Sequence, residues 1–184
     1  MATTDRIILG IDPGTNIFGY GLIHNKGNKI ELITMDVVKL SKLDDTYMKL
    51  GKIFSETLAI IDKYKPDEMA IEAPFFGKNV QSMLKLGRAQ GVTIAAALYR
   101  SIPVFEYSPR KIKQSITGKG SATKEQVAQM LERLVIINSM PKYFDATDAL
   151  GVAVCHYFQK VPKSGTKSYS GWKAFVTNNP DRMV

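Results

Sequence analysis

The sequence predicts an α/β domain built on a five-stranded mixed sheet flanked by helices. Two short segments, residues 7–11 and 68–72, have the apolar composition of strands buried on both faces of a sheet. Between them lie a hairpin, over residues 16–38, and a helical repeat of apolar residues. A helical crossover usually returns the chain to the same sheet, so the strand at 68–72 is expected beside the first strand and parallel to it.

Turn signals define the strands. Pro13 and Gly14 end the first one, and the segment 25–28 forms a hairpin turn in which Gly27 supplies a positive φ. We therefore expect strands over residues 7–11, 16–23, 29–38, 68–72 and 102–107.

Capping signals and apolar spacing define the helices. Ser108 followed by Pro109 is an N-cap with proline in the first turn, and Thr123 with Gln126 forms a capping box. Helices are expected from Asp44 or Asp45 to about residue 64, over 78–100, from 109, from 123 and from about Pro141 to Phe158. The first of these should bury a face made of Tyr47, Leu50, Ile53, Phe54, Leu58 and Ile61.

Composition and charge narrow the class of protein. The 184 residues carry a net charge of +8, and five basic residues against one acidic residue fall in 160–184. We interpret residues 1–159 as a single domain and 160–184 as a basic, flexible tail. No apolar run approaches the roughly 20 residues of a membrane span, and Cys155 alone excludes a disulfide framework. These features predict a cytoplasmic protein with a polyanionic partner.

Four acidic residues are candidates for a metal site. Asp12 and Glu72 end the two strands expected to be parallel neighbours, and Asp145 and Asp148 share a face of the last helix. Carboxylates brought together repel one another, and hard divalent cations such as Mg²⁺ relieve that repulsion. Two such ions could activate a water and stabilise the leaving oxygen of a phosphodiester. Each acid also has a plainer interpretation: Asp12 could cap its turn, Glu72 and Asp148 could face solvent, and Asp145 could stabilise the helix dipole.

Several blocks in order carry a resemblance to a known family. They are Gly10-Ile-Asp-Pro-Gly-Thr15, Gly19-Tyr-Gly21, Ile71-Glu72, Leu84-Lys-Leu-Gly-Arg-Ala-Gln-Gly91, Val104-Phe-Glu-Tyr107 and Asp145-Ala-Thr-Asp-Ala-Leu150. Over residues 6–158 the chain resembles the RuvC family of Holliday-junction resolvases.

The resemblance implies a ribonuclease H-like fold and a homodimer that resolves four-way DNA junctions in recombination and repair. It implies paired, symmetric nicking with two Mg²⁺ ions per subunit, for which Mn²⁺ can substitute, and products with 5′-phosphate and 3′-hydroxyl ends. It makes Asp12, Glu72, Asp145 and Asp148 the catalytic, metal-binding acids. A branch-migration helicase complex is the implied protein partner.

Further residues are candidates for contacts with DNA. Phe75 and Phe76 follow the Glu72 strand, where exposed aromatic rings can stack on unpaired bases or pack under the loop, and the resemblance favours Phe75 as the residue that stacks. Lysine and arginine candidates for phosphate contacts, which could equally be solvated surface residues, are Lys78, Arg88, Arg110, Lys113, Lys119 and Lys124. Lys113 and Lys124 are the first choices, because the resemblance aligns them with basic residues near the family's active site. Gly87, Gly91 and Ala95 leave a smooth helix face for the sheet or for a second subunit.

Three other functions compete with this one. A related nuclease could act on structured RNA, or the protein could bind junctions without cutting them. Asp-x-Gly-Thr after a strand also occurs in actin-like ATPases and sugar kinases, but that class needs two such domains, and this chain has one copy of the motif.

Overall fold

The computed structural model describes residues 5–26, 29–74, 79–135 and 144–159. Its strands are β1 (Arg6–Asp12), β2 (Ile17–Lys26), β3 (Lys29–Lys39), β4 (Glu68–Glu72) and β5 (Val104–Tyr107). Its helices are α1 (Thr46–Tyr64), α2 (Val80–Tyr99), α3 (Pro109–Thr117), α4 (Lys124–Leu134) and α5 (Phe144–Phe158). The sheet has the strand order β3-β2-β1-β4-β5.

The pairing of the strands confirms the predicted mixed sheet. β1 pairs antiparallel with β2, and β2 with β3, as the hairpin turn requires. β4 lies parallel to β1 on its other side, and β5 lies parallel to β4. The central strand β1 therefore has one antiparallel and one parallel neighbour.

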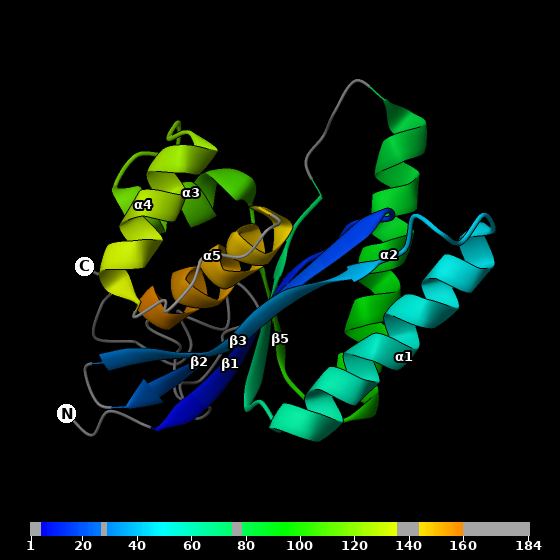
Figure 1. Cartoon of the computed structure of the whole chain (residues 1–184), viewed down its shortest axis with the longest axis horizontal. Coiled ribbons are helices and arrows are strands. Elements are labelled where there is room, and N and C mark those ends of the chain that lie inside the picture. Colours follow the sequence, from blue (N-terminus) through cyan, green and yellow to red (C-terminus); the bar gives the residue numbers. More distant parts are fainter. Residues whose placement is uncertain (1–4, 27–28, 75–78, 136–143, 160–184) are drawn as a thin grey trace, which may run out of the picture.

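Helices cover both faces of the sheet (Figure 1). α1 and α2 lie side by side on one face, and α5 lies on the other face with α3 and α4 packed against it. The alternation of side chains along β1 matches these two layers. Leu9 and Ile11 pack in the core with Ile53 and Ile61 of α1, whereas Ile8 packs in the core with residues of α5, such as Leu150.

Caps confirm the predicted starts of α1, α3 and α4. The Asp45 side chain accepts a hydrogen bond from the Met48 amide, and Thr123 and Gln126 form the expected capping box. α2 begins at Val80 rather than 78, because the Asn79 side chain caps it by accepting from the Ser82 amide. β5 begins at Val104, two residues later than expected, because Pro103 has no amide hydrogen to pair.

One expected core residue is exposed, and some predictions fall outside the described residues. Tyr47 is 77% exposed because it lies in the first turn of α1, ahead of Ile53, the first fully buried side chain of that helix. The expected helix start at Pro141 and the segment 160–184 lie outside the described ranges. None of the helices within those ranges is long and apolar enough to cross a membrane.

Candidate active site

The four predicted acids come together at one edge of the sheet. β1 and β4 run parallel with Ile11 opposite Ile71, so Asp12 and Glu72, the next residues, end neighbouring strands side by side. Asp148, in the second turn of α5, lines a cleft of about 240 Å³ with these two carboxylates. Asp145 lies one turn earlier on α5, close enough to raise the pKa of Asp12.

Burial and mutual repulsion make this edge unfavourable for negative charge. Burial raises the pKa of Asp12 to about 7, and the charges of Glu72, Asp148 and Asp145 add to the effect. The pKa of Glu72 is also raised to about 7, first by burial and then by Asp148. A positive charge placed among these carboxylates would lower both pKa values, so the cleft is suited to a cation.

Lysines supply part of that positive charge. The Lys124 ammonium donates a hydrogen bond of 2.5 Å to Asp148 Oδ2, and this bond raises the pKa of Lys124. Lys113 lines the same cleft and partly offsets the rise in the Glu72 pKa. Within the described ranges, no three acidic, histidine or cysteine side chains are placed so that they could hold a metal ion together without moving. Asp148 is turned towards Lys124 instead.

The turn-capping interpretation of Asp12 finds no support. Among the described residues, burial and neighbouring charges, and no hydrogen bond from the amides of Gly14 or Thr15, set the pKa of its carboxylate. Its oxygens are therefore free to act as ligands. A set of hard oxygen donors in which two are half-buried and repel one another fits a divalent cation.

Glycines in β1 and β2 allow α5 to lie directly on the sheet. A Cβ at Gly19 would come within 2.2 Å of the carbonyl oxygen of Asp145, and one at Gly10 within 2.2 Å of the carbonyl oxygen of Ala149. A side chain at either position would lift the helix from the strands. The glycines thus determine how close α5 lies to the sheet, and with it how near Asp145 and Asp148 come to the strand ends that carry Asp12 and Glu72. Sequence reasoning missed this role, although glycine inside a strand is a known signal of close backbone approach.

Gly151, unexplained by the sequence, has a packing role. It lines the acidic cleft, and a Cβ there would lie 3.2 Å from Ile116 Cδ1 of α3. The absence of a side chain lets α3 approach α5.

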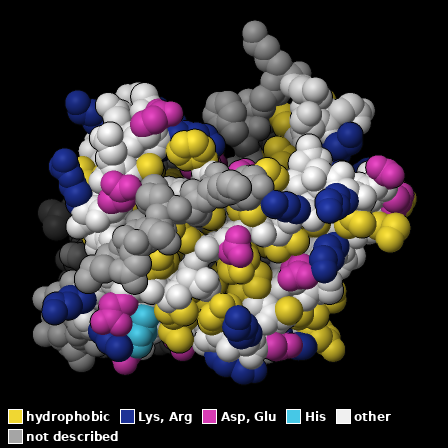
Figure 2. All heavy atoms as spheres, viewed as in Figure 1, with side chains coloured by type: hydrophobic (Ala, Val, Ile, Leu, Met, Phe, Trp, Pro, Cys, Tyr) yellow, Lys and Arg dark blue, Asp and Glu magenta, His cyan; other side chains and the backbone are white. Residues whose placement is uncertain are grey.

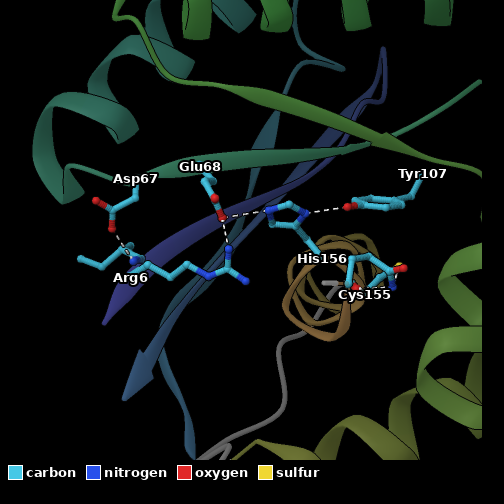
Figure 3. Close-up of polar contacts among 8 residues, drawn as sticks. Arg6, Asp67, Glu68, Tyr107, Cys155 and His156 are labelled. Carbon is cyan, nitrogen blue, oxygen red and sulfur yellow. Dashed lines mark hydrogen bonds and ion pairs between the residues drawn. The ribbon is translucent and has the colours of Figure 1, made fainter. Parts of the chain in front are cut away.

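A buried polar network anchors the other end of α5 (Figure 3). His156 is fully buried, with Nε2 2.9 Å from Glu68 Oε2 and Nδ1 2.6 Å from the Tyr107 hydroxyl. Arg6 donates to the same Glu68 oxygen at 2.7 Å. The network joins the last turns of α5 to the first residues of β1 and β4 and to Tyr107, which ends β5 beside Glu72. Sequence reasoning left His156 as either structural or exposed, and the structure supports the first.

The other predicted DNA contacts are spread more widely. Lys119 lines a separate hollow with Arg133, and Arg110 packs against Gly120. Arg88 borders an apolar hollow formed by Pro74 and α2. The predicted contacts outside the described ranges are Phe75, Phe76 and Lys78.

A mixed sheet of this order with acids at the shared end of β1 and β4 defines the class of ribonuclease H-like nucleases. A family model for crossover junction endodeoxyribonuclease RuvC matches residues 8–156. The RuvC of Cytophaga hutchinsonii is 61% identical over 181 residues, covering 98% of this chain and 90% of the relative. That of Porphyromonas gingivalis is 54% identical, and the match covers all of both chains.

A solved structure gives the same result. The structure of T. thermophilus RuvC in complex with Holliday junction substrate superposes with a TM-score of 0.78 at 32% identity, covering 83% of this chain and 93% of that one. The chain belongs to the RuvC family of crossover junction endodeoxyribonucleases.

Proposed function

We propose that this protein resolves four-way DNA junctions by nicking two strands symmetrically, leaving 5′-phosphate and 3′-hydroxyl ends. The observation that carries the proposal is the convergence of Asp12, Glu72 and Asp148 in one cleft, with Asp145 beside them. Family membership, and the junction substrate in the T. thermophilus structure, support the choice of DNA substrate. An intact set of acids also favours an enzyme over a protein that only binds junctions.

Divalent metal dependence follows from the family, and the chemistry of the site favours Mg²⁺. We propose that Asp12, Glu72, Asp145 and Asp148 hold two ions per subunit and that Mn²⁺ can replace Mg²⁺. When bound, the ions would supply Lewis acidity for hydrolysis of the scissile phosphodiester. The carboxylates would have to be ionised to bind them, so the raised pKa values of Asp12 and Glu72 make binding depend on pH near 7.

The two lysines of the cleft orient the substrate. Lys113 and Lys124 line the cleft with the acids, where their ammonium groups can bind non-bridging oxygens of the scissile phosphate. Lys124 would exchange its hydrogen bond with Asp148 for one with the phosphate, and the exchange would free Asp148 as a ligand. Phe75 and Phe76 remain our candidates for stacking on unpaired bases.

A homodimer would place two such sites on one junction, as paired nicking requires. Gly91 and Ala95 face outward from α2, so the alternative that this face packs on its own sheet is wrong. Val80, Leu84 and Leu98 are each more than half exposed on the same helix. We define Val80, Leu84, Gly87, Gly91, Ala95 and Leu98 as the α2 stripe and propose it as the subunit contact. An apolar, small-residue helix face is suited to close packing against a second copy.

Three further parts of the proposal concern the whole chain. Residues 1–159 form the nuclease domain, and 160–184 a basic tail suited to polyanions. Cys155 is buried and unpaired, which fits the reducing cytoplasm. A branch-migration helicase complex is the proposed protein partner.

One assay tests the proposed function. A synthetic four-way junction, a linear duplex and an RNA hairpin are each incubated with the protein, with and without Mg²⁺. We expect paired nicks on the junction alone and only with the metal. Cleavage of the hairpin instead would favour the structured-RNA nuclease, and junction binding without any cleavage would favour a scaffold.

The acids are tested in the same assay. Asp145→Asn should reduce cleavage below detection yet retain junction affinity, because the amide removes a charge without changing the side chain's shape. Glu132→Gln, an exposed position on α4, is the matched control and should cut normally. A rate for Asp145→Asn equal to that of wild type would remove Asp145 from the site.

A further inference from the structure

A second cleft opens at the same end of β1, on the opposite face of the sheet from α5. It has a volume of about 390 Å³ and lies between α1 and α2. Thr15 and Asn16, which line it, follow the catalytic candidate Asp12 by three and four residues. The acidic cleft and this one therefore flank the same strand end.

The lining of this cleft is cationic and rich in hydrogen-bond donors. Lys49 and Lys85 contribute ammonium groups, and Ser82 contributes a hydroxyl. Lys49 Nζ lies 3.2 Å from Asn16 Oδ1, a neutral partner. Within the described ranges, no carboxylate forms an ion pair with Lys49 or Lys85, whereas Lys52 on the same helix pairs with Glu56 at 2.6 Å.

The position of the helices adds to the positive character. Thr46, the first residue of α1, and Ser82, in the first turn of α2, both line the cleft, so both amino-terminal ends face it. The dipole at such an end favours an anion, and at α1 the Asp45 carboxylate that caps the helix already occupies part of that position. Asp44 is the acidic residue that lines the cleft and opposes this effect. In the space-filling view, lysine and arginine side chains lie over the upper part of α1, interspersed with acidic ones (Figure 2).

We propose that this cleft, which we call the Lys49–Lys85 cleft, binds the phosphodiester backbone of the DNA substrate. The proposal rests on the function proposed above and names a contact that lies outside the acidic cleft. Lys113 and Lys124 stand on the α5 side of the strand end, and Lys49 and Lys85 on the other side. A DNA strand laid across this edge to reach the acids meets ammonium groups on both sides. The cleft thus holds the backbone a short distance from the scissile phosphate.

The counterions released on binding provide the test. Each phosphate neutralised by a lysine contributes about 0.9 to the slope of log affinity against log salt concentration. Junction binding is measured from 50 to 300 mM salt, in chelator to prevent cleavage, for wild type and the double variant Lys49→Gln/Lys85→Gln. We expect the slope to fall by about 2 and the affinity at low salt to fall at least tenfold.

The matched control is Lys52→Gln/Lys63→Gln, which removes the same charge from α1 outside the cleft. It should leave the slope unchanged. A slope for Lys49→Gln/Lys85→Gln equal to that of wild type would overturn the proposal, and so would an equal fall in the control. Thermal unfolding of each variant verifies that it folds. If the double variant does not fold, Lys85→Gln alone takes its place, and its slope should be lower than that of wild type by about 1.

The two proposals fail in different ways. If wild-type protein neither binds nor cuts the junction, the proposed function is wrong, and the backbone site falls with it. If wild type binds and cuts while the double variant keeps the wild-type slope, only the backbone site is wrong.

Discussion

Asp12 ends a strand in the middle of the sheet, where water cannot fully solvate its charge. Its ordinary pKa is near 3.8, and burial together with Glu72 raises it to about 7. Above pH 7 the metal-free protein must hold an ionised carboxylate in an unfavourable place. Binding a cation removes this cost, which is the physical reason to expect a metal at this position.

The same shift makes the stability of the metal-free protein depend on pH. Between about pH 4 and 7 the unfolded chain has released the Asp12 proton and the folded protein retains it, so the free energy of unfolding falls as pH rises through this window. Asp12→Asn carries no charge and avoids the loss. At pH 8 in chelator we expect the variant to be more stable than wild type by up to about 4 kcal/mol, or about 8–16 °C in Tm.

Differential scanning calorimetry at pH 4 and pH 8 measures this difference. The two proteins should unfold at similar temperatures at pH 4, because this pH is close to the pKa of Asp12 in the unfolded chain and little of the stability has yet been lost. If the Tm of Asp12→Asn exceeds that of wild type by the same amount at both pH values, or does not exceed it at pH 8, the pKa of Asp12 is not raised in the folded protein.

Individual residues were unequally predictable from the sequence. Asp12 and Glu72 could be placed together because their strands end at the same edge, and Lys113 and Lys124 by resemblance to the family. The sequence did not reveal that Lys124 pairs with Asp148, because that contact depends on how α4 packs beside α5. The Lys49–Lys85 cleft was also missed, since lysines on a helix surface usually signal only solvation.

At the scale of elements, the placement of α5 decides the geometry of the site. The strand glycines bring its first half onto the sheet, and the network around His156 holds its last turn. Two fixed ends leave the helix little freedom to slide or rotate. Asp145 and Asp148 thereby keep their distance from Asp12.

Gly19→Ala tests this placement. The new Cβ would overlap the carbonyl oxygen of Asp145, so the first turn of α5 must move, at a cost of about 1–3 kcal/mol in stability. We expect junction cleavage to fall at least tenfold at a temperature well below Tm, and to need more Mg²⁺ than wild type, while junction affinity is kept.

Gly51→Ala on α1 is the control, because a Cβ there meets nothing within 4 Å. It should cut at the wild-type rate and gain up to about 1 kcal/mol from helix propensity. If Gly19→Ala cleaves junctions at the wild-type rate and needs no more Mg²⁺ than wild type, α5 can shift on the sheet without loss of activity, and its placement does not decide the geometry of the site.

Most elements were predictable because their signals are local. Caps such as Asp45 and Thr123 fixed helix starts, and turn residues separated the strands. The burial of His156 was not predictable, since it depends on contacts between elements distant in sequence, and the apolar spacing of α1 did not show that its first turn lies beyond the core.

For the molecule as a whole, strand order followed from general rules of chain connection, and the subunit contact did not. Nothing in the spacing of Gly87, Gly91 and Ala95 distinguished a face packed on the sheet from one turned outward. The structure turns it outward. The α2 stripe is then an apolar surface that a second copy would cover.

Leu84→Glu should disrupt that contact, because a buried, unpaired carboxylate at a subunit interface is costly. Sedimentation velocity should give a dimer for wild type and a monomer for the variant. Tyr47→Glu, at another exposed apolar side chain, should remain dimeric. A dimeric Leu84→Glu protein would place the interface elsewhere.

The central claim, that acids distant in the chain gather to hold divalent cations, is tested most directly by Mn²⁺ binding. Electron paramagnetic resonance of the free ion measures binding at pH 6 and pH 8 for wild type, Asp12→Asn and Glu132→Gln. Wild type and Glu132→Gln should bind Mn²⁺ more tightly at pH 8, as Asp12 and Glu72 ionise, and Asp12→Asn should bind at least tenfold more weakly than wild type. Undiminished binding by Asp12→Asn at pH 8 would contradict the claim.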